Sequence, residues 1–245
     1  HPSFIRVQLL PIATGFSFIA LIVYLPIWFI GIKGYSEFQA GLAILPLTAP
    51  MVIIPLLSGI LAKYFNSTIL CSLGLGSAAI GAYSLSNIES QSSSINIVIS
   101  MIVIGIGNGL PWGLMDGLAM NTVPKERAGM AAGIFSTIRV TGEAIAIAII
   151  GAALIGLTTQ SLIELKIPEY ISINISTLAN SVASGNILIN TNNLTSAEKM
   201  YLIRATGEAY THGLQVILRV ISTLTLCSSI VLWFTVRKSF PIRGN

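Results

Sequence analysis

Charged residues are scarce in this chain, which has 13 basic and 9 acidic residues among 245. They make up 9% of the sequence, whereas soluble domains carry about 25%. The apolar share is 53% and the mean hydropathy is +0.83. So little polar surface does not cover a water-facing body, and the same composition excludes a disordered chain. The sequence therefore predicts a membrane protein with several spans.

Cysteine and histidine are equally rare. Cys71 and Cys227 lie in apolar runs and are predicted to be small buried side chains. There is no CxxC pair, Cys/His cluster or HExxH sequence, so no metal site is expected. His212 has no evident Ser or Asp partner, and an enzyme is the least expected class. The net charge of +4 comes from basic residues scattered at the ends of apolar runs, which indicates no nucleic-acid partner.

Long apolar runs are present instead. A helix needs about 20 apolar residues to cross the roughly 30 Å core of a bilayer, and these runs lack the alternation of barrel strands. We therefore predict an all-α membrane protein with six transmembrane helices, the first five within residues 1–157. Their ranges are about 8–32, 38–62, 68–86, 95–120, 128–157 and 213–236.

Two further segments complete the predicted organisation. Residues 158–212, rich in Ser, Asn and Thr, are expected to form a long external loop, and 237–245 a cytoplasmic tail. Lys and Arg gather beside the two termini and the 2–3 and 4–5 connections, whereas the other side's short loops hold only Lys33. By the positive-inside rule, both ends of the chain are expected in the cytoplasm, with the helices in the plasma membrane.

Glycine recurs every four residues in the fourth predicted span, at Gly105, Gly109, Gly113 and Gly117. These positions share one helix face, and a glycine face lets another helix approach closely in lipid. Pro111 lies in the same span. The span is expected either to pack only, or also to bend at Pro111 and slide against a neighbour.

Prolines interrupt the second predicted span at Pro46, Pro50 and Pro55. Each lacks a backbone N–H and leaves a carbonyl free, which is tolerated where a neighbouring helix or water satisfies it. Pro46 and Pro50 therefore indicate a structural kink, a hinge or a helix that lines a cavity.

Four charged residues lie inside the predicted spans: Asp116, Arg139, Glu143 and Arg219. Charges at bilayer depth cost about 2.5–3.5 kcal/mol and are usually paired or face water. Glu143 is near the middle of the fifth span, one turn from Arg139 on the same face. Apolar surroundings favour the neutral carboxyl and Arg139 favours the carboxylate. The pair is either a structural ion pair or a site where Glu143 binds a proton or another cation.

Asp116 and Arg219 have two possible roles each. They could take part in proton coupling or substrate binding, or they could have a structural role. Asp116 is near the cytoplasmic end of its span, where it can reach the interface or cap the turn before Lys125. Arg219 is about two turns from the outer end of the sixth span, where its side chain can extend to the interface. Trp112 and Tyr24 are either interfacial residues or aromatic contacts for a flat cation.

These segments together resemble a known transporter family. The resemblance is carried by the runs Gly109–Gly113, Asn121–Gly133, Arg139–Gly142, Gly34–Pro46 and Ser58–Lys63. They are similar to the later spans of the fourteen-span drug:proton antiporters of the major facilitator superfamily. The resemblance covers nearly the whole chain, about residues 4–238.

The resemblance implies the C-terminal six-helix half of such a carrier, built from 3+3 inverted repeats. The family often carries a membrane-embedded acid in the penultimate span, where Glu143 lies. The proton gradient would be the energy source, with no cofactor. The implied partners are the bilayer, a small-molecule substrate and an N-terminal half of six or eight helices, in the same chain or a separate one. The chain begins with His1 rather than Met, so we expect it to be a fragment.

Three functions remain open on the sequence. The first is part of a proton-coupled exporter of drugs or other lipophilic small molecules. The second is export of an endogenous metabolite or organic anion bound by Arg139 and Arg219. The third is a truncated membrane protein that does not transport.

Overall fold

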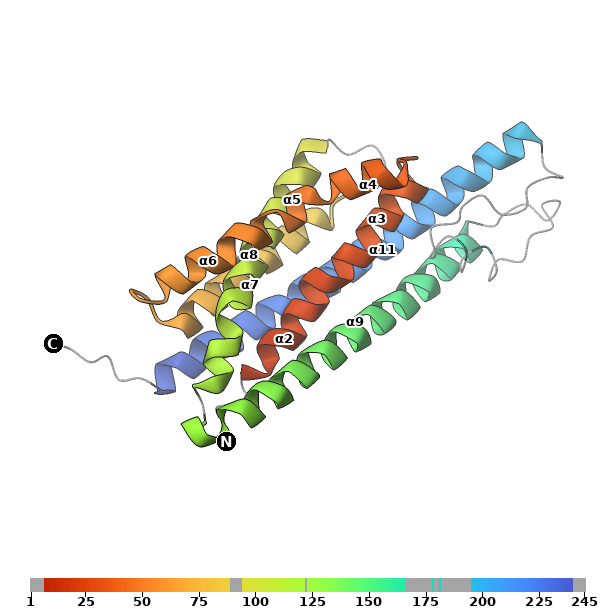
Figure 1. The fold of residues 1–245 in the computed structure, drawn as a ribbon. Coiled ribbons are helices and arrows are strands. Elements are labelled where there is room, and N and C mark those ends of the chain that lie inside the picture. The colour runs from red at the N-terminus through yellow and green to blue at the C-terminus, as the bar shows by residue number, and fades with distance from the viewer. Residues whose placement is uncertain are drawn as a thin grey trace.

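The computed structural model describes residues 7–88, 94–121, 123–165, 178, 181 and 195–239. Within these residues all regular structure is helical, in a bundle of long helices (Figure 1). Six helices are long and apolar enough to cross a membrane, which confirms the predicted fold class. They are Leu10–Gly31, Glu37–Leu61, Ser67–Leu85, Ser94–Met120, Lys125–Glu164 and Met200–Phe234.

The first span changes its helical winding part-way along. Its segments are α2 (Leu9–Thr14), the π-helical turn η1 (Gly15–Ile19) and α3 (Ala20–Gly31). The N–H of Ala20 donates to the carbonyl of Gly15, five residues back, where an α-helix would bond four residues back. Single π turns inside α-helices are frequent at functional sites.

The second span is divided at its prolines. Its segments are α4 (Glu37–Ala43), α5 (Leu45–Thr48) and α6 (Pro50–Leu61). Pro46 is in the first turn of α5 and Pro50 begins α6, because a residue without an N–H is best accommodated at a helix start. Ser36 and Gln39 form a capping box that starts α4.

The third and fourth spans are α7 (Ser67–Leu85) and α8 (Ser94–Met120). Small residues let them pack closely. A Cβ at Gly74 would lie 2.6 Å from the carbonyl oxygen of Gly107, and a Cβ at Gly81 would lie 2.8 Å from Cγ1 of Ile104. Only glycine fits at such distances, so these residues set the α7–α8 contact.

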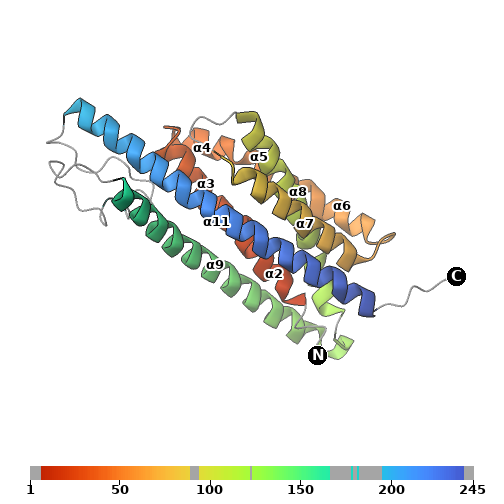
Figure 2. The ribbon, with the colours of Figure 1, turned by 180° about the vertical axis from the view of Figure 1, so that it is seen from behind.

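The last two spans are the longest. After the 3₁₀ turn η2 (Lys125–Arg127), α9 covers Ala128–Glu164, and α11 covers Ser196–Ser239. Figure 2 shows α11 running across the front of the bundle, on the far side from the view of Figure 1.

The predicted loop 158–212 and tail 237–245 are wrong at their borders. Residues 158–164 continue α9, residues 196–212 begin α11, and α11 continues to Ser239. The described remainder of the loop is Leu165, Leu178, Ser181 and Thr195; its other residues, and 240–245 of the tail, lie outside the described residues.

The physical reason for the longer helices is pairing between α9, α11 and the first span. Near the end of α9, the polar Thr158 and the apolar Leu162 are both wholly buried. A Cβ at Gly213 of α11 would lie 3.4 Å from Oγ1 of Thr158. Trp28 of α3 is also wholly buried and its indole N–H donates to Oγ1 of Thr211 at 3.0 Å. Hydropathy drops along these residues because polar side chains occur among them, and helix packing buries these side chains. The hydroxyl of Thr211 is bonded to Trp28, whereas Oγ1 of Thr158 has no hydrogen-bond partner among the described residues.

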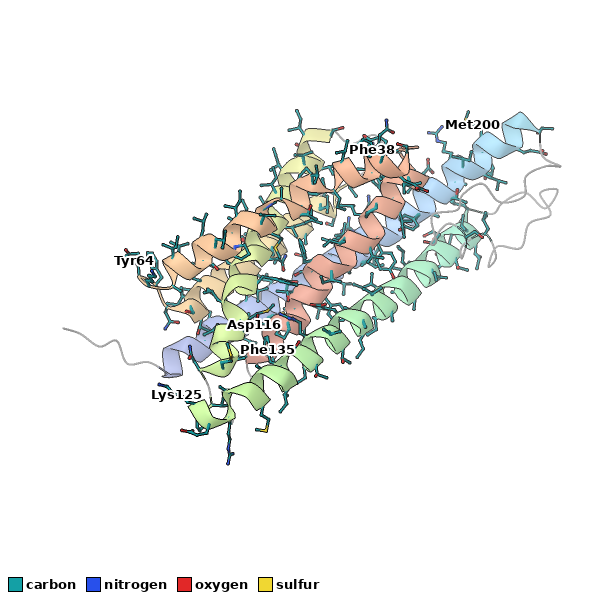
Figure 3. The ribbon with its side chains drawn as sticks, in the orientation of Figure 1. Phe38, Tyr64, Asp116, Lys125, Phe135 and Met200 are labelled. Carbon is teal, nitrogen blue, oxygen red and sulfur yellow. The ribbon has the colours of Figure 1, made fainter. Side chains whose placement is uncertain are left out.

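The two ends of the bundle are distinct. Figure 3 places Tyr64 and Lys125 toward one end, and Phe38 and Met200 toward the other. Cys71 is buried as predicted, but Cys227 is exposed on α11, because an apolar residue of an outer span can face lipid as well as the core.

Candidate functional site

Glu143 of α9 packs directly against the π turn of the first span. A Cβ at Gly15 would lie 3.4 Å from Cα of Glu143 and 3.5 Å from its Cγ. A Cβ at Gly15 would thus touch Glu143 at an ordinary van der Waals distance, so the first and fifth spans are neighbours at the level of the acid. The fifth predicted span thus brings Glu143 to a place where the first span departs from regular α-helix.

The carboxyl group of Glu143 has an unsatisfied oxygen. Its Oε1 atom is buried and has no hydrogen-bond partner. An ionised carboxylate buried without partners is strongly unfavourable, and inside a membrane such a group marks a functional site by default. A partly buried carboxyl with one oxygen that has no partner is suited to carry a proton.

Arg139 is turned toward α8. Its Nη1 atom lies 3.5 Å from Oδ1 of Asp116, and these side chains are 23% and 56% exposed. The guanidinium also lies over the ring of Trp112, 5.7 Å from its centroid. Asp116 was expected to reach the interface or to cap a turn; it instead pairs with Arg139 while remaining more than half exposed. The aromatic contact made by Trp112 is with Arg139 of this chain.

An aromatic contact connects this cluster to the π turn. Phe18 of η1 meets Trp112 edge-on, with ring centroids 6.5 Å apart. The indole Nε1 of Trp112 is buried and has no hydrogen-bond partner. Two polar atoms, one on Trp112 and one on Glu143, are thus left without partners on the helices that flank η1.

A second polar contact on η1 was missed by the sequence analysis. The hydroxyl of Ser17 donates to Oδ1 of Asn108 at 2.7 Å, and Nδ2 of Asn108 donates to the carbonyl of Ile104 at 3.0 Å. Ser17 and Asn108 are wholly buried. The sequence carries a signal for this contact, because Asn108 is an uncharged amide within an apolar span.

Some of the glycines predicted to form the packing face of α8 contact the second span, and one does not. A Cβ at Gly105 would overlap the carbonyl oxygen of Leu47, and one at Gly109 would lie 2.7 Å from Cβ of Ile54. A Cβ at Gly113 would overlap Ser58. These three pack against the second span, but a Cβ at Gly117 would meet nothing within 4 Å, so the expected four-residue face ends at Gly113.

The prolines lie at helix contacts. The ring of Pro50 lies beside Gly105, with Cγ 3.1 Å from where a Cβ would be. Pro111 faces the third span, where its Cδ lies 2.9 Å from a Cβ placed at Gly74. The helix α8 is continuous through Pro111 from Ser94 to Met120. Sliding at Pro111 and a hinge at Pro46 and Pro50 stay predictions.

Arg219 lies apart from this cluster. It is exposed on α11, six residues beyond Gly213, which meets Leu157 of α9. Since the two helices are antiparallel, Arg219 is roughly 18 Å along the bundle from Arg139, at 1.5 Å per residue. The two arginines therefore lie far apart along the bundle, and their binding of an organic anion stays a prediction.

His212 has a partner that the sequence did not suggest. Its Nδ1 lies 3.3 Å from Oγ of Ser161 at the exposed ends of α9 and α11. No contact between this pair and an Asp or Glu is seen in the described part of the chain. The pair therefore lacks the orienting acid that a Ser–His nucleophile uses.

Comparison with known families identifies this arrangement. Residues 2–147, more than half of the chain, match the model of the Major Facilitator Superfamily. The chain belongs to this superfamily. The match includes η1, α8 and the part of α9 that carries Arg139 and Glu143, so it covers the whole cluster. It confirms the superfamily expected from the sequence, a family of transporters, and identifies the chain as an integral membrane protein.

Relatives within the Major Facilitator Superfamily come from several bacteria. An uncharacterized transporter, YebQ, of Escherichia coli K12 is 32% identical over 135 residues, which cover 55% of this chain and 28% of that protein. The multidrug resistance protein Stp of Mycobacterium tuberculosis is 32% identical over 141 residues, 56% of this chain and 26% of Stp. Multidrug resistance protein 3 of Bacillus subtilis is 26% identical over 159 residues, 65% and 31% of the two chains. The chain therefore matches less than a third of each relative's length.

Proposed function

We propose that this chain is the C-terminal part of a carrier that exports drugs or other lipophilic small molecules in exchange for protons. Membership of the Major Facilitator Superfamily and the relatives named for multidrug resistance support export. The observation that carries the coupling role is the buried, unpartnered Oε1 of Glu143 beside the π turn. The proposal includes the fourteen-span subfamily, with the proton gradient as energy source and without a bound cofactor.

In this proposal each group of the cluster has a task. Glu143 takes up a proton when its carboxyl is closed off from water and loses it when water gains access. Arg139 is held by Asp116 and Trp112, so its charge is partly balanced and does not have to pair with Glu143. Trp112, which is partly exposed, offers aromatic surface to a lipophilic substrate beside the acid, and the buried Phe18 supports its ring by an edge contact. Proton binding and substrate binding at adjoining groups is what an exchange mechanism requires.

A second half is part of the proposal. The second and fifth spans are the least covered within this chain, and carriers of this superfamily bind substrate between two halves that rock about the midplane. We place an N-terminal half of six or eight helices, in the same chain or a separate one, against these two spans, Glu37–Leu61 and Lys125–Glu164. The mass of the native polypeptide tests this: about twice 26.0 kDa means one chain. A native mass near 26.0 kDa requires a separate half that copurifies with it, and its absence rejects the proposal.

The proposed location is the plasma membrane with both ends of the segment in the cytoplasm. Lys63, in the connection between α6 and α7, and Lys125 of η2 are exposed, and Figure 3 shows Tyr64 and Lys125 toward the same end of the bundle. Basic residues at one end support this orientation. Single cysteines placed at Lys63 and at Phe38, labelled from outside intact cells, test it: only the second should react.

The decisive experiment replaces Glu143 with Gln in the intact carrier. Everted membrane vesicles are given a proton gradient, and accumulation of a lipophilic dye is measured. We expect gradient-driven accumulation to be lost while gradient-independent exchange of substrate remains, because Gln keeps the size of Glu but binds no proton. The matched control is Glu164→Gln at the exposed end of the same helix, which should keep the normal rate. Gradient-driven accumulation at the normal rate in Glu143→Gln would remove the coupling role.

A further inference from the structure

Gln8 lies at the start of the first span and is buried, although its side chain is polar. It is 8% exposed, and neither Oε1 nor Nε2 has a hydrogen-bond partner among the described residues. A buried amide without partners is unfavourable, and a leucine side chain would fill a similar volume without this cost. Packing alone therefore does not account for glutamine at this position.

The side chain of Gln8 lies on the face of the first span that meets α9. Gln8, Ile12 and Gly15 follow one another at spacings of four and three residues, so they share one face of a helix. The backbone of Gln8 is already helical, with φ −66° and ψ −15°. A Cβ at Gly142 of α9 would lie 3.7 Å from Cγ1 of Ile12, and Gly15 meets Glu143. The amide is thus on the same helix interface as the acid.

The first span and α9 run in the same direction (Figure 1). Gly15 meets Glu143, and further along both helices the hydroxyl of Tyr24 donates to the carbonyl of Ile147 at 2.8 Å. Gln8 precedes Gly15 by seven residues, so it lies roughly 10 Å nearer the end of the bundle where α9 begins. In the proposed orientation this is the cytoplasmic end.

A charged pair lies between the levels of Glu143 and Gln8. Arg139 is one turn before Glu143, roughly 6 Å closer to the start of α9, and its Nη1 lies 3.5 Å from Oδ1 of Asp116. The guanidinium alone would repel a passing proton, but the Asp116 carboxylate balances its charge. Asp116 is 56% exposed, so water has access at this level. Polar groups therefore follow one another from the acid toward the cytoplasmic end.

We propose that the amide of Gln8 positions the water that receives the proton leaving Glu143 toward the cytoplasm. This inference rests on the proposed function. The amide does not ionise, but its oxygen accepts and its nitrogen donates hydrogen bonds, and a buried water makes about three bonds to polar groups that otherwise have none. Gln8 is thereby a positioning residue rather than a proton carrier.

The release step takes place when the cytoplasmic end opens and water reaches the amide. The O–H bond of the Glu143 carboxyl then breaks, the water bound at Gln8 takes up the proton and passes it to the cytoplasm, and Glu143 keeps the negative charge. The same opening gives the amide of Gln8 the hydrogen bonds that it lacks in the closed form. This accounts for a polar side chain at a buried position.

The experiment uses the intact carrier in everted vesicles, with the cytoplasmic side facing the medium. Gln8→Leu removes the amide and nearly keeps the volume. We expect gradient-driven accumulation of a lipophilic dye to fall about ten-fold, since loss of one ordinary hydrogen bond changes a rate by up to this factor. Gradient-independent exchange should stay unchanged. The ratio of the rates in light and heavy water should rise, because proton release then limits the cycle, and a merely structural role would not raise it.

Two further variants test the amide itself. Gln8→Asn keeps the amide, is one methylene shorter and leaves room for water, so it should keep most of the rate. The matched control is Gln160→Leu, the same change at an exposed position of α9. It should behave as the unmodified carrier in every readout.

The outcomes separate this inference from the proposed function. An unmodified carrier without gradient-driven accumulation would reject the proposed function. Where the unmodified carrier is driven by the gradient, a normal rate and a normal isotope ratio in Gln8→Leu would overturn the role of Gln8 alone. Equal losses of gradient-driven accumulation and of exchange would also overturn it, because Gln8 would then be a structural contact. If Gln8→Leu does not reach the membrane, Gln8→Met is judged by the same readouts.

Discussion

Arg139 of α9 lies 3.5 Å from Asp116 of α8, although Glu143 is only one helical turn away on its own helix. The pairing links the fourth and fifth spans and draws the guanidinium over Trp112. It leaves Oε1 of Glu143 buried without a partner. Because Arg139 pairs with Asp116, it does not hold Glu143 in an ion pair. Glu143 therefore keeps the capacity to bind a proton, which it would lose in a closed Arg–Glu pair.

Asp116→Asn should make Glu143 give up its proton more readily. Without the competing carboxylate, the charge of Arg139 acts more strongly on Glu143 and favours the carboxylate. The pH profile of gradient-driven export should therefore move to lower pH. The shift should be a fraction of a pH unit, since Asp116 is 56% exposed and water screens the pair. Export by the intact carrier in everted vesicles, measured from pH 5 to pH 8, tests this.

The matched control for that shift is Glu126→Gln, an exposed acid of η2 at the same end of the bundle. It removes one negative charge without touching Arg139. An equal shift in both variants would mean that general surface charge, rather than the Arg139 pair, sets the profile.

Gly105→Ala should destabilise the bundle where Gly117→Ala does not. A Cβ at Gly105 overlaps the carbonyl of Leu47, which is backbone and cannot turn away. Overpacking of this kind costs about 1–3 kcal/mol. At Gly117, with nothing within 4 Å, alanine should be neutral or stabilise by up to about 1 kcal/mol through helix propensity. Denaturant unfolding in mixed micelles compares them, and equal stabilities would contradict the assigned α5–α8 contact.

Much of the fold was predictable because apolar run length alone sets the number of spans. The six-helix class and the superfamily were confirmed, and Glu143 was selected because a carboxyl inside an apolar run is physically unusual. The close approach of another helix to Gly105, Gly109 and Gly113 followed from their four-residue spacing, but the second span as that partner did not. Features of this kind are predictable because each depends on the residues of one segment and on the apolar interior of the membrane around it.

Other features depend on which segments meet, and the sequence does not show this directly. The Asp116–Arg139 pair joins two residues that are 23 positions apart, on consecutive spans, and the π turn lies where Gly15 meets Glu143. The ends of α9 and α11 extend beyond their apolar runs because Thr158 and Thr211 are buried against neighbouring helices, where Thr211 is hydrogen-bonded to Trp28. A hydropathy scan treats these threonines as loop residues, since it does not register burial between helices.

The Ser17–Asn108 hydrogen bond should contribute measurably to the position of η1. Its strength can be isolated with a double-mutant cycle of Ser17→Ala, Asn108→Ala and the combined variant. Side-chain hydrogen bonds between membrane helices average about 0.6 kcal/mol, with a maximum near 1.7 kcal/mol. We expect a coupling energy in that range from unfolding in mixed micelles. Strict additivity of the two single variants would show that the contact does not fix the π turn.

The start of α11 should loosen in acid through Glu198, which lies before the apolar part of that helix. The backbone N–H of Thr195 donates to Oε2 of Glu198 at 2.7 Å and its hydroxyl donates at 2.8 Å. These bonds hold the pKa of Glu198 below its usual value, the backbone bond contributing most. A depressed carboxyl pKa stabilises the folded form above the unfolded pKa of about 4.3, and this stabilisation is lost as pH falls through the lower folded value.

Hydrogen exchange of 196–203 should therefore accelerate in acid beyond its intrinsic pH dependence. The acid-dependent acceleration should vanish in Glu198→Gln, which is already loosened at pH 7, and persist in the control Glu208→Gln. Acid loosening that survives Glu198→Gln would place its cause elsewhere in α11.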